Sequence, residues 1–178
     1  MSWTDLTDKV VIITGGAAGI GLAVAKGFIE VGANVMIADF SEEAGQKAAD
    51  EASEAGPGEA RFARCDVTQK ADVDQMIQST LDAFGSVDAL VNNAGINVPR
   101  LLVDPTGKEE LTEDIWDKVF AVNVKGQFLC AQAAARVMLK QANGGVLINM
   151  SSESGLEGSE GQSVYAATKA ANQNVTRS

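Results

Sequence analysis

The sequence of 178 residues contains no histidine. Without an imidazole group the chain cannot form a Ser-His-Asp triad or a Cys-His pair, and nearly every kind of zinc site is excluded. We therefore expect no metal centre. Any acid–base chemistry must depend on tyrosine, lysine, aspartate or glutamate.

Basic residues, cysteines and long apolar runs are also scarce. There are 14 basic and 24 acidic residues, and the net charge of −10 argues against a nucleic-acid partner, whose phosphodiester backbone is negative. No apolar run approaches the ~18 residues of a membrane helix, and the first residues lack the basic start and apolar centre of a signal peptide. The only two cysteines, Cys65 and Cys130, lie in apolar stretches typical of buried thiols. We therefore expect a cytoplasmic protein that does not enter a membrane.

Near its start the sequence contains a strand, a glycine turn and a helix in succession. Residues 10–13 form a β-branched apolar run typical of a strand buried on both faces. The glycines that follow are Gly15, Gly16, Gly19 and Gly21. The apolar stripe of the predicted helix consists of Ile20, Val24, Phe28 and Val31. Such a turn presents backbone N–H groups at a helix N-terminus, where a phosphate binds, although a turn of this spacing also occurs without any ligand.

The next predicted strand, residues 33–38, leads to Asp39, which lies 18 residues after Gly21. This is close to the offset of ~20 residues at which an acid binds the adenosine ribose of a dinucleotide. A carboxylate there accepts hydrogen bonds from NAD and repels the 2′-phosphate of NADP, and no lysine or arginine occurs in the glycine turn or directly after Asp39. The alternative is that Asp39 only caps the turn after its strand. Together with the glycine turn, Asp39 favours NAD as the cofactor.

Strands and helices alternate along the rest of the chain. The predicted strands cover residues 10–13, 33–38, 60–65, 87–91 and 146–150. Helices are predicted to begin at Ser41, Thr68 and Thr112, and a last helix begins near Ser163. This order predicts an α/β fold, a Rossmann-like doubly wound parallel sheet whose nucleotide crevice lies between the first and fourth strands. Because two complete mononucleotide-binding halves need six strands, we expect residues 1–178 to form one domain that is incomplete at its C-terminus.

Tyr165 and Lys169 stand four residues apart in the last predicted helix, so their side chains share one face. An ammonium about 5 Å from a phenol favours the phenolate by roughly 3 kcal/mol at an effective dielectric of about 20. This suits proton transfer near neutral pH. Ser152, on the loop before this helix, is placed to hydrogen-bond the same substrate oxygen. The alternative is an ordinary surface pair, since this spacing is common by chance.

In chain order these motifs resemble the short-chain dehydrogenase/reductase family from residue 9 onward. The positions that carry the resemblance are Thr14, Gly15, Gly19, Gly21, Asp66, Val67, Asn92, Asn93, Ala94, Gly95, Asn123, Ser152, Tyr165 and Lys169. The resemblance implies that Tyr165 is the general acid/base and that Lys169 supports it and binds the nicotinamide ribose. It implies that Ser152 holds the substrate oxygen and that Asn123 anchors a water of the proton relay.

The same resemblance implies a cofactor site. Its expected members are Gly15, Gly19, Ile20, Gly21, Asp39, Asp66, Val67, Asn93, Ala94, Gly95, Tyr165 and Lys169. Members of the family continue beyond the helix that carries the tyrosine and lysine, with further strands and a loop that covers the substrate. We therefore expect those parts to be missing from this chain, which stops at Ser178.

A finer resemblance concerns the loops at residues 99–104 and 151–163, which are similar to those of bacterial sorbitol-6-phosphate 2-dehydrogenases. It implies a polyol or a sugar-alcohol phosphate as the substrate. The substrate contacts that it implies are Arg100 for a phosphate and Glu153, Glu157 or Gln162 for hydroxyl groups. For Arg100, a solvated loop position is an equally good interpretation.

Together these observations predict an NAD-dependent oxidoreductase that interconverts a small-molecule secondary alcohol and its ketone. Two alternatives stay open: a reductase of 3-oxoacyl thioesters on an acyl carrier protein, and a nucleotide-binding chain without turnover. The first would favour NADP and a basic surface, so Asp39 and the net charge of −10 argue against it. The resemblance further implies a homo-oligomer packed through the long helices, whose many alanines suit close contact.

Overall fold

The structure, a computed structural model, describes residues 6–177, and the predicted end of the last helix at Ser178 lies outside them. The strands are β1 Val10–Thr14, β2 Asn34–Asp39, β3 Ala60–Arg64, β4 Ala89–Asn92 and β5 Val146–Asn149. The helices are α1 Gly19–Glu30, α2 Glu42–Ser53, α3 Lys70–Phe84, α4 Glu113–Phe120, α5 Gln127–Met138, α6 Ser154–Glu157 and α7 Ser163–Arg177. A π-helical segment, η1 Ala121–Gly126, joins α4 to α5.

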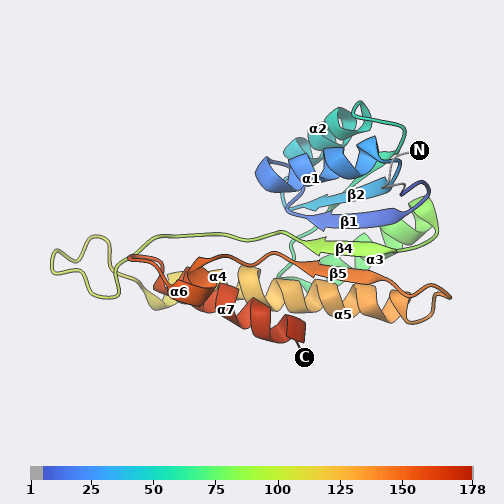
Figure 1. Cartoon of the computed structure of the whole chain (residues 1–178). Coiled ribbons are helices and arrows are strands. Elements are labelled where there is room, and N and C mark those ends of the chain that lie inside the picture. The colour runs from blue at the N-terminus through green and yellow to red at the C-terminus, as the bar shows by residue number, and fades with distance from the viewer. Residues whose placement is uncertain (1–5, 178) are drawn as a thin grey trace.

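The five strands form one parallel sheet in the order β3-β2-β1-β4-β5, with helices on both faces (Figure 1). The chain runs outward from β1 to β3 and then returns to place β4 on the other side of β1. The strand order therefore reverses between β1 and β4. The predicted doubly wound fold is confirmed. The reversal lies between the first and fourth strands, where the nucleotide crevice is predicted, and ligands of such sheets bind at a reversal, beyond the carboxyl ends of the strands.

Alternate residues of the central strands enter two separate cores. Val11 and Ile13 of β1 pack in the core that α1 and α2 cover, whereas Ile12 packs in the core that α3 and α5 cover. All three side chains are at most 2% exposed. Burial on both faces explains why the strand is an uninterrupted run of β-branched residues rather than an alternating pattern.

The buried stripe of α1 differs from the prediction. It consists of Gly21, Ala25 and Ile29. Val24 and Phe28 pack at the edge of this stripe, and Ile20 is 64% exposed. The reason is the closeness of the packing: a Cβ at Gly21 would lie 2.7 Å from Nδ2 of Asn93. The first half of the stripe is therefore limited to the small residues Gly21 and Ala25, and only Ile29 near the end of the helix is large.

Helix α3 begins at Lys70, two residues after the predicted start at Thr68. The Thr68 hydroxyl donates to Oδ1 of Asp66 over 2.8 Å, and the Thr68 backbone N–H donates to the same oxygen over 2.9 Å. Thr68 therefore closes a turn after β3 instead of capping the helix. By contrast, Ser41 and Thr112 do cap their helices, as predicted, by accepting from Ala44 N–H and Ile115 N–H.

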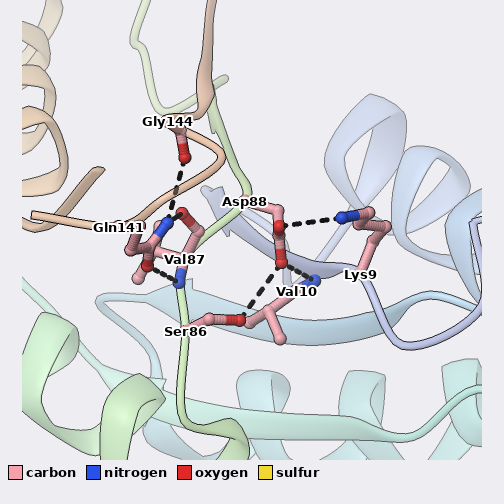
Figure 2. Close-up of polar contacts among 7 residues, drawn as sticks. All are labelled: Lys9, Val10, Ser86, Val87, Asp88, Gln141 and Gly144. Carbon is pink, nitrogen blue, oxygen red and sulfur yellow. Dashed lines mark hydrogen bonds and ion pairs between the residues drawn. The ribbon is translucent and has the colours of Figure 1, made fainter. Parts of the chain in front are cut away.

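A carboxylate closes the amino ends of β1 and β4, which we call the amino edge of the sheet (Figure 2). Asp88, just before β4, accepts hydrogen bonds from Val10 N–H at 2.9 Å, the Ser86 hydroxyl at 3.1 Å and Lys9 Nζ at 3.2 Å. Burial raises the pKa of Asp88, but these bonds together outweigh burial and leave the pKa below its ordinary value. The carboxylate therefore ties the two neighbouring strands together.

Gln141 completes the amino edge from the segment after α5 (Figure 2). Its side-chain amide accepts from Val87 N–H at 2.9 Å and donates to Val87 O and Gly144 O, both at 3.0 Å. Val87 is fully buried, so Gln141 supplies the hydrogen bonds that this backbone group could not obtain from water.

Strand β5 forms one border of the sheet and is far less covered than β1. Val146, Leu147 and Ile148 are 57%, 37% and 40% exposed. Because consecutive side chains of a strand point to opposite faces, exposure of all three means that neither face of β5 is fully covered by the described residues.

The composition led to expectations about membrane helices, metal sites and the two cysteines, and the described residues bear on each. No helix within residues 6–177 is both long and apolar enough to cross a membrane. Within the same residues, no group of three or more cysteines, aspartates and glutamates is placed to hold a metal ion. Cys65 and Cys130 are buried free thiols, as predicted. Burial raises the pKa of Cys65 to about 12 and also raises that of Cys130, so both stay protonated.

Candidate active site

The glycine turn joins β1 to α1 at the reversal of strand order. Gly15 adopts a φ of 64°, and its N–H and that of Gly16 donate to Ala38 O over 2.8 and 3.3 Å. A Cβ at Gly21 would lie 2.2 Å from Gly15 O, so only glycine allows the first turn of α1 to approach this closely. At Gly19, in contrast, a Cβ would meet nothing within 4 Å, so this face of the turn is open.

The N-terminus of α1 is free to bind an anion. No side chain caps it, and its first turn carries no acidic residue. Helices α2 and α4 differ, because each has a hydroxyl cap and two acids in the first turn. A helix start without a side-chain cap, no acid in the first turn and an open glycine turn are features that suit a pyrophosphate. The residues present therefore fit a dinucleotide.

Asn93 joins this turn to the end of β4 by hydrogen bonds. Its Nδ2 donates to Thr14 O and to Gly15 O, both over 3.0 Å. The Thr14 hydroxyl in turn accepts from Asn93 N–H at 3.2 Å and from Ala94 N–H at 3.1 Å. Among the expected cofactor residues, Asn93 thus shapes the turn, while Ala94 and Gly95 line the neighbouring cavity.

A cavity of about 600 Å³ opens beside the turn, between the ends of β2, β3 and β4. Expected cofactor residues that line it are Gly15, Asp39, Asp66, Val67, Ala94 and Gly95. Further lining residues are Phe40, Cys65, Thr68, Ile96, Lys118, Ala121 and Val122. The cavity is large enough for a nucleoside, and we call it the adenosine cavity.

Asp39 caps the turn after β2, one of the two roles that the sequence left open, and its role toward a cofactor stays a prediction. One carboxylate oxygen accepts from Ser41 N–H and the other from Ala17 N–H, each over 3.1 Å. The first bond is a cap of the turn after β2, and the second links Asp39 to the glycine turn. Because Asp39 also lines the adenosine cavity, its remaining lone pairs can receive ribose hydroxyls.

The structure adds a pair of residues that the sequence did not indicate, Phe40 and Arg64. Phe40 is 67% exposed and lines the adenosine cavity. The guanidinium carbon of Arg64 lies 5.6 Å from the centre of the Phe40 ring. Arg64 is also the register partner of Asp39 in the sheet. A basic residue therefore does stand beside Asp39, and an alignment of the two strands by their apolar patterns could have found it.

Tyr165 and Lys169 meet at a second cavity, of about 170 Å³, next to the adenosine cavity. The two cavities share Gly95 and Ile96, and the second is also lined by Ile20, Asn93, Asn97, Met150 and Ser151. Lys169 is 5% exposed, its Nζ donates to Met150 O at 2.8 Å, and Nζ lies 5.6 Å from the centre of the Tyr165 ring. Burial lowers the pKa of Lys169. We call this the tyrosine cavity.

Asn123 is buried in η1 and connects three parts of the site. Its Oδ1 accepts from Ile96 N–H at 2.8 Å, and its Nδ2 donates to Ile96 O at 2.9 Å and to the Thr168 hydroxyl at 3.1 Å. Asn123 thus fixes the loop after β4 against α7. Its expected contact with a relay water therefore remains a prediction.

Ser152 lies on the loop before α6, outside the lining of the tyrosine cavity. Its hydroxyl is 2.8 Å from the Ser154 hydroxyl and accepts from Ser154 N–H at 3.3 Å. Its expected role toward the substrate oxygen therefore remains a prediction. Helix α6, which begins at Ser154, was not predicted, because four residues with two glycines nearby carry too little pattern.

The segments after β4 and after β5 leave the carboxyl ends of the strands on the same side of the sheet (Figure 1). A bridge between them pairs the expected substrate residues Arg100 and Gln162. Arg100 N–H donates to Gly161 O at 2.7 Å, and its guanidinium pairs with Glu109 at 2.8 Å. Arg100 thus already has an anionic partner, and neither residue lines the tyrosine cavity. Glu153 is exposed just before α6.

Asp104 holds the first of these loops in shape. Its carboxylate accepts hydrogen bonds from the backbone N–H groups of Glu109, Thr106 and Lys108 and from the Thr106 hydroxyl. These bonds, led by that from Glu109, lower the pKa of Asp104 to about 2. The loop therefore keeps a defined conformation although it contains no helix or strand.

Comparison with known proteins finds related chains along nearly the whole sequence. A family model described as short chain dehydrogenase matches residues 9–178. A crystal structure of a short chain dehydrogenase from Mycobacterium smegmatis superposes with a TM-score of 0.91 and is 34% identical. That comparison covers 98% of this chain and 70% of the solved one.

Two curated relatives carry more specific names. A sorbitol-6-phosphate 2-dehydrogenase of Klebsiella pneumoniae is 45% identical over 180 residues, covering 99% of this chain. A 3-oxoacyl-acyl-carrier-protein reductase of Chlamydia muridarum is 40% identical over 165 residues, covering 93% of this chain. The chain spans 64% of the length of each of these relatives.

Proposed function

The chain belongs to the short-chain dehydrogenase family, and from that premise we propose that it binds NAD and interconverts a secondary alcohol and its ketone. The observation that carries the proposal is the contact between the two cavities. The adenosine cavity with Asp39 and the tyrosine cavity with Tyr165 and Lys169 share Gly95 and Ile96 and flank the glycine turn. One extended dinucleotide can therefore span both.

The bound nicotinamide would supply the acceptor or donor of the hydride. Tyr165 takes the hydroxyl proton of the alcohol, or returns it to the ketone oxygen, because it lines the tyrosine cavity together with Lys169, whose ammonium is already bonded to Met150 O. The ammonium of Lys169 lies 5.6 Å from the centre of the Tyr165 ring. The bond from Lys169 to Met150 O fixes the position of that charge. Asn123 holds α7, and so both side chains, in place.

The preference for NAD over NADP rests on Asp39. Its carboxylate is held by two backbone N–H groups and lines the adenosine cavity. A fixed negative charge at that place accepts hydrogen bonds from ribose hydroxyls and repels a 2′-phosphate.

We propose a polyol or a sugar-alcohol phosphate as the substrate. The similarity to a sorbitol-6-phosphate 2-dehydrogenase supports this class. Arg100 would contact the phosphate, and Glu153 and Gln162 the hydroxyl groups, after a rearrangement that frees Arg100 from Glu109. The second candidate is a 3-oxoacyl thioester, supported by the 40% identical reductase.

The test combines cofactor titration with a substrate panel. NADH fluorescence gives the dissociation constant, and the panel contains sorbitol 6-phosphate, sorbitol, galactitol and an acetoacetyl thioester. Tyr165→Phe keeps the ring but removes the proton-transfer oxygen. We expect turnover to fall about 10²–10⁴-fold while NADH affinity changes less than about threefold. A loss of turnover below about tenfold would assign the proton transfer to another group. Binding of NADH without turnover of any compound would favour the nucleotide-binding alternative.

We also propose that the protein is a cytoplasmic homo-oligomer that pairs through α4, η1, the start of α5 and α7. A groove of about 490 Å³ between these elements is lined mainly by apolar side chains, among them Phe120, Val124, Phe128 and Val175. Phe128 and Val175 are each 45% exposed. Light scattering measures the mass in solution. Phe128→Glu should lower it, whereas Leu139→Glu, at an exposed position outside the groove, should not.

A further inference from the structure

Arg64 stands at the carboxyl end of β3, beside the residue proposed to choose the cofactor. The register pairs Arg64 with Asp39, and Cys65 N–H donates to Asp39 O over 2.9 Å. The guanidinium is not carried by the glycine turn or by the residue after Asp39. It comes from the neighbouring strand and lies over Phe40, which lines the adenosine cavity.

Two contacts fix where the guanidinium of Arg64 lies. It rests 5.6 Å from the centre of the Phe40 ring, at the wall of the adenosine cavity. Its Nη1 also lies 3.2 Å from Oδ2 of Asp72 in α3. The same Asp72 oxygen accepts from Asp66 N–H at 3.0 Å, which links the ion pair to the adenosine cavity. Asp72 therefore neutralises Arg64 next to the ribose position.

The guanidinium of Arg64 can exchange Asp72 for another anion. The Arg64 side chain is 50% exposed and that of Asp72 28% exposed, and ion pairs this accessible to water are weak. A phosphate binds a guanidinium through two parallel hydrogen bonds, more strongly than one carboxylate oxygen does. Asp39 cannot turn away from such a phosphate, because both of its oxygens are bonded to backbone N–H groups.

We propose that Arg64 is a second determinant of cofactor choice at this site, a guanidinium that Asp72 holds back from the 2′-phosphate of NADP. The inference rests on the proposed dinucleotide site. Asp39 opposes the 2′-phosphate, Arg64 favours it, and the ion pair with Asp72 sets the balance toward NAD.

The chain offers a matched control on the same strand. Arg61 also stacks on an aromatic ring, 5.7 Å from the centre of Phe84, and forms an ion pair with Glu59 at 2.6 Å. Its side chain is 53% exposed, close to the value for Arg64. Arg61 lies toward the amino end of β3, away from the adenosine cavity. Replacing either arginine removes one positive charge and one ring contact, so only position distinguishes them.

The experiment measures the dissociation constants of NADH and NADPH for the wild-type chain and five variants: Arg64→Ala, Arg64→Lys, Asp72→Asn, the Asp72→Asn/Arg64→Ala double variant and Arg61→Ala. Asp72→Asn removes the charge but keeps an oxygen that can accept from Asp66 N–H. We expect Asp72→Asn to improve NADPH binding relative to NADH about fivefold to tenfold. Arg64→Ala should weaken relative NADPH binding by a similar factor, with partial recovery in Arg64→Lys.

The double variant decides the mechanism. If Arg64 binds the phosphate, the gain from Asp72→Asn disappears when Arg64 is absent, whereas two independent effects would add. Arg61→Ala should leave the ratio within about twofold of wild type. The inference alone is overturned if NADH binds but Arg64→Ala behaves like Arg61→Ala, or if the gain from Asp72→Asn persists in the double variant. If the wild-type chain binds neither dinucleotide, both the proposed function and this inference are wrong.

Discussion

The two edges of the sheet use the same kinds of polar side chain in opposite ways. At the amino edge, Asp88 and Gln141 direct their hydrogen bonds to the ends of β1 and β4 and to the loops beside them (Figure 2). At the carboxyl edge, Asp39 and Lys169 are also anchored by backbone groups, and they line the two cavities that flank the glycine turn. Asp88 borders a cavity too, of about 290 Å³, but three of its hydrogen bonds go to groups at the strand ends. The amino edge thus ties the strand ends together, and the carboxyl edge places polar groups around the glycine turn.

This difference follows from where the chain supplies partners. The loops at the amino ends are short and bring Gln141 and Ser86 directly onto Val87 and Asp88. At the carboxyl ends the strand order reverses, so the segments after β1 and β4 leave the sheet in different directions and leave space between them. Substitutions at the amino edge should therefore change stability alone, whereas those at the carboxyl edge should change ligand binding.

The largest effect is expected at Gly21, where a substitution should change both the stability of the fold and the binding of NADH. In Gly21→Ala the new Cβ would lie 2.2 Å from Gly15 O and 2.7 Å from Asn93 Nδ2, so backbone must move. We expect a loss of about 3 kcal/mol in the free energy of unfolding and loss of NADH binding. Denaturant titration measures the first quantity. Gly27→Ala, in the same helix with open space at its Cβ, should instead be neutral or stabilising.

Gln141→Ala tests whether the amino edge is purely structural. It leaves the N–H and C=O of buried Val87 without their side-chain partner, which should cost about 2 kcal/mol of unfolding free energy. The NADH dissociation constant should stay within about twofold of wild type. Gln78→Ala removes a comparable amide from the exposed face of α3 and should be nearly neutral. A large change in NADH affinity on Gln141→Ala would contradict the separation of the two edges.

Asp39→Ser tests the carboxyl edge. Serine removes the charge but can still accept one backbone hydrogen bond, so the ratio of the NADPH to the NADH dissociation constant should fall about tenfold. Asp50→Ser removes the same charge from an exposed position of α2 and should leave this ratio unchanged. An unchanged ratio in Asp39→Ser would remove Asp39 from the cofactor site.

The smallest effect is expected for Lys9→Met at the amino edge. The Lys9 side chain is 46% exposed, so its ion pair with Asp88 should contribute less than about 1 kcal/mol. Asp88 has a lowered pKa in the folded state, so its stabilisation is fully present above its unfolded pKa of about 4 and is lost as the pH falls from there through the lower pKa of the folded state. Thermal melting at pH 7 and pH 3 should show a small difference between Lys9→Met and wild type that shrinks at the lower pH.

The sequence was sufficient for the features that depend on local pattern. The runs of β-branched residues located the strands, and Ser41 and Thr112 located two helix starts by their capping chemistry. Tyr165 and Lys169 could be paired because their spacing within one helix places them on one face. Asp39 could be related to the glycine turn because the distance along the chain between them is characteristic.

Features that depend on contacts between distant segments could not be predicted in this way. The approach of Arg64 to Phe40 depends on the register of β2 and β3, and the bonds of Asn123 to Ile96 and Thr168 depend on three separate segments. The prediction of the buried stripe of α1 was wrong for a related reason. Large apolar residues usually form the contact between a helix and a sheet. The first turn of α1, however, lies so close to Asn93 that only glycine fits at position 21.

The π-helical segment η1 has a consequence for the alignment of the helices that it joins. An α-helix has about 3.6 residues per turn, so each residue rotates the chain by about 100°. One additional residue therefore rotates all later side chains by that angle. A π-helical hydrogen bond spans five residues instead of four and absorbs such a residue without ending the helix. The phase of α5 relative to α4 is thus set by η1. Deleting a single residue there would keep a continuous helix but turn Cys130 and Ala134 of α5 away from the core that they now fill.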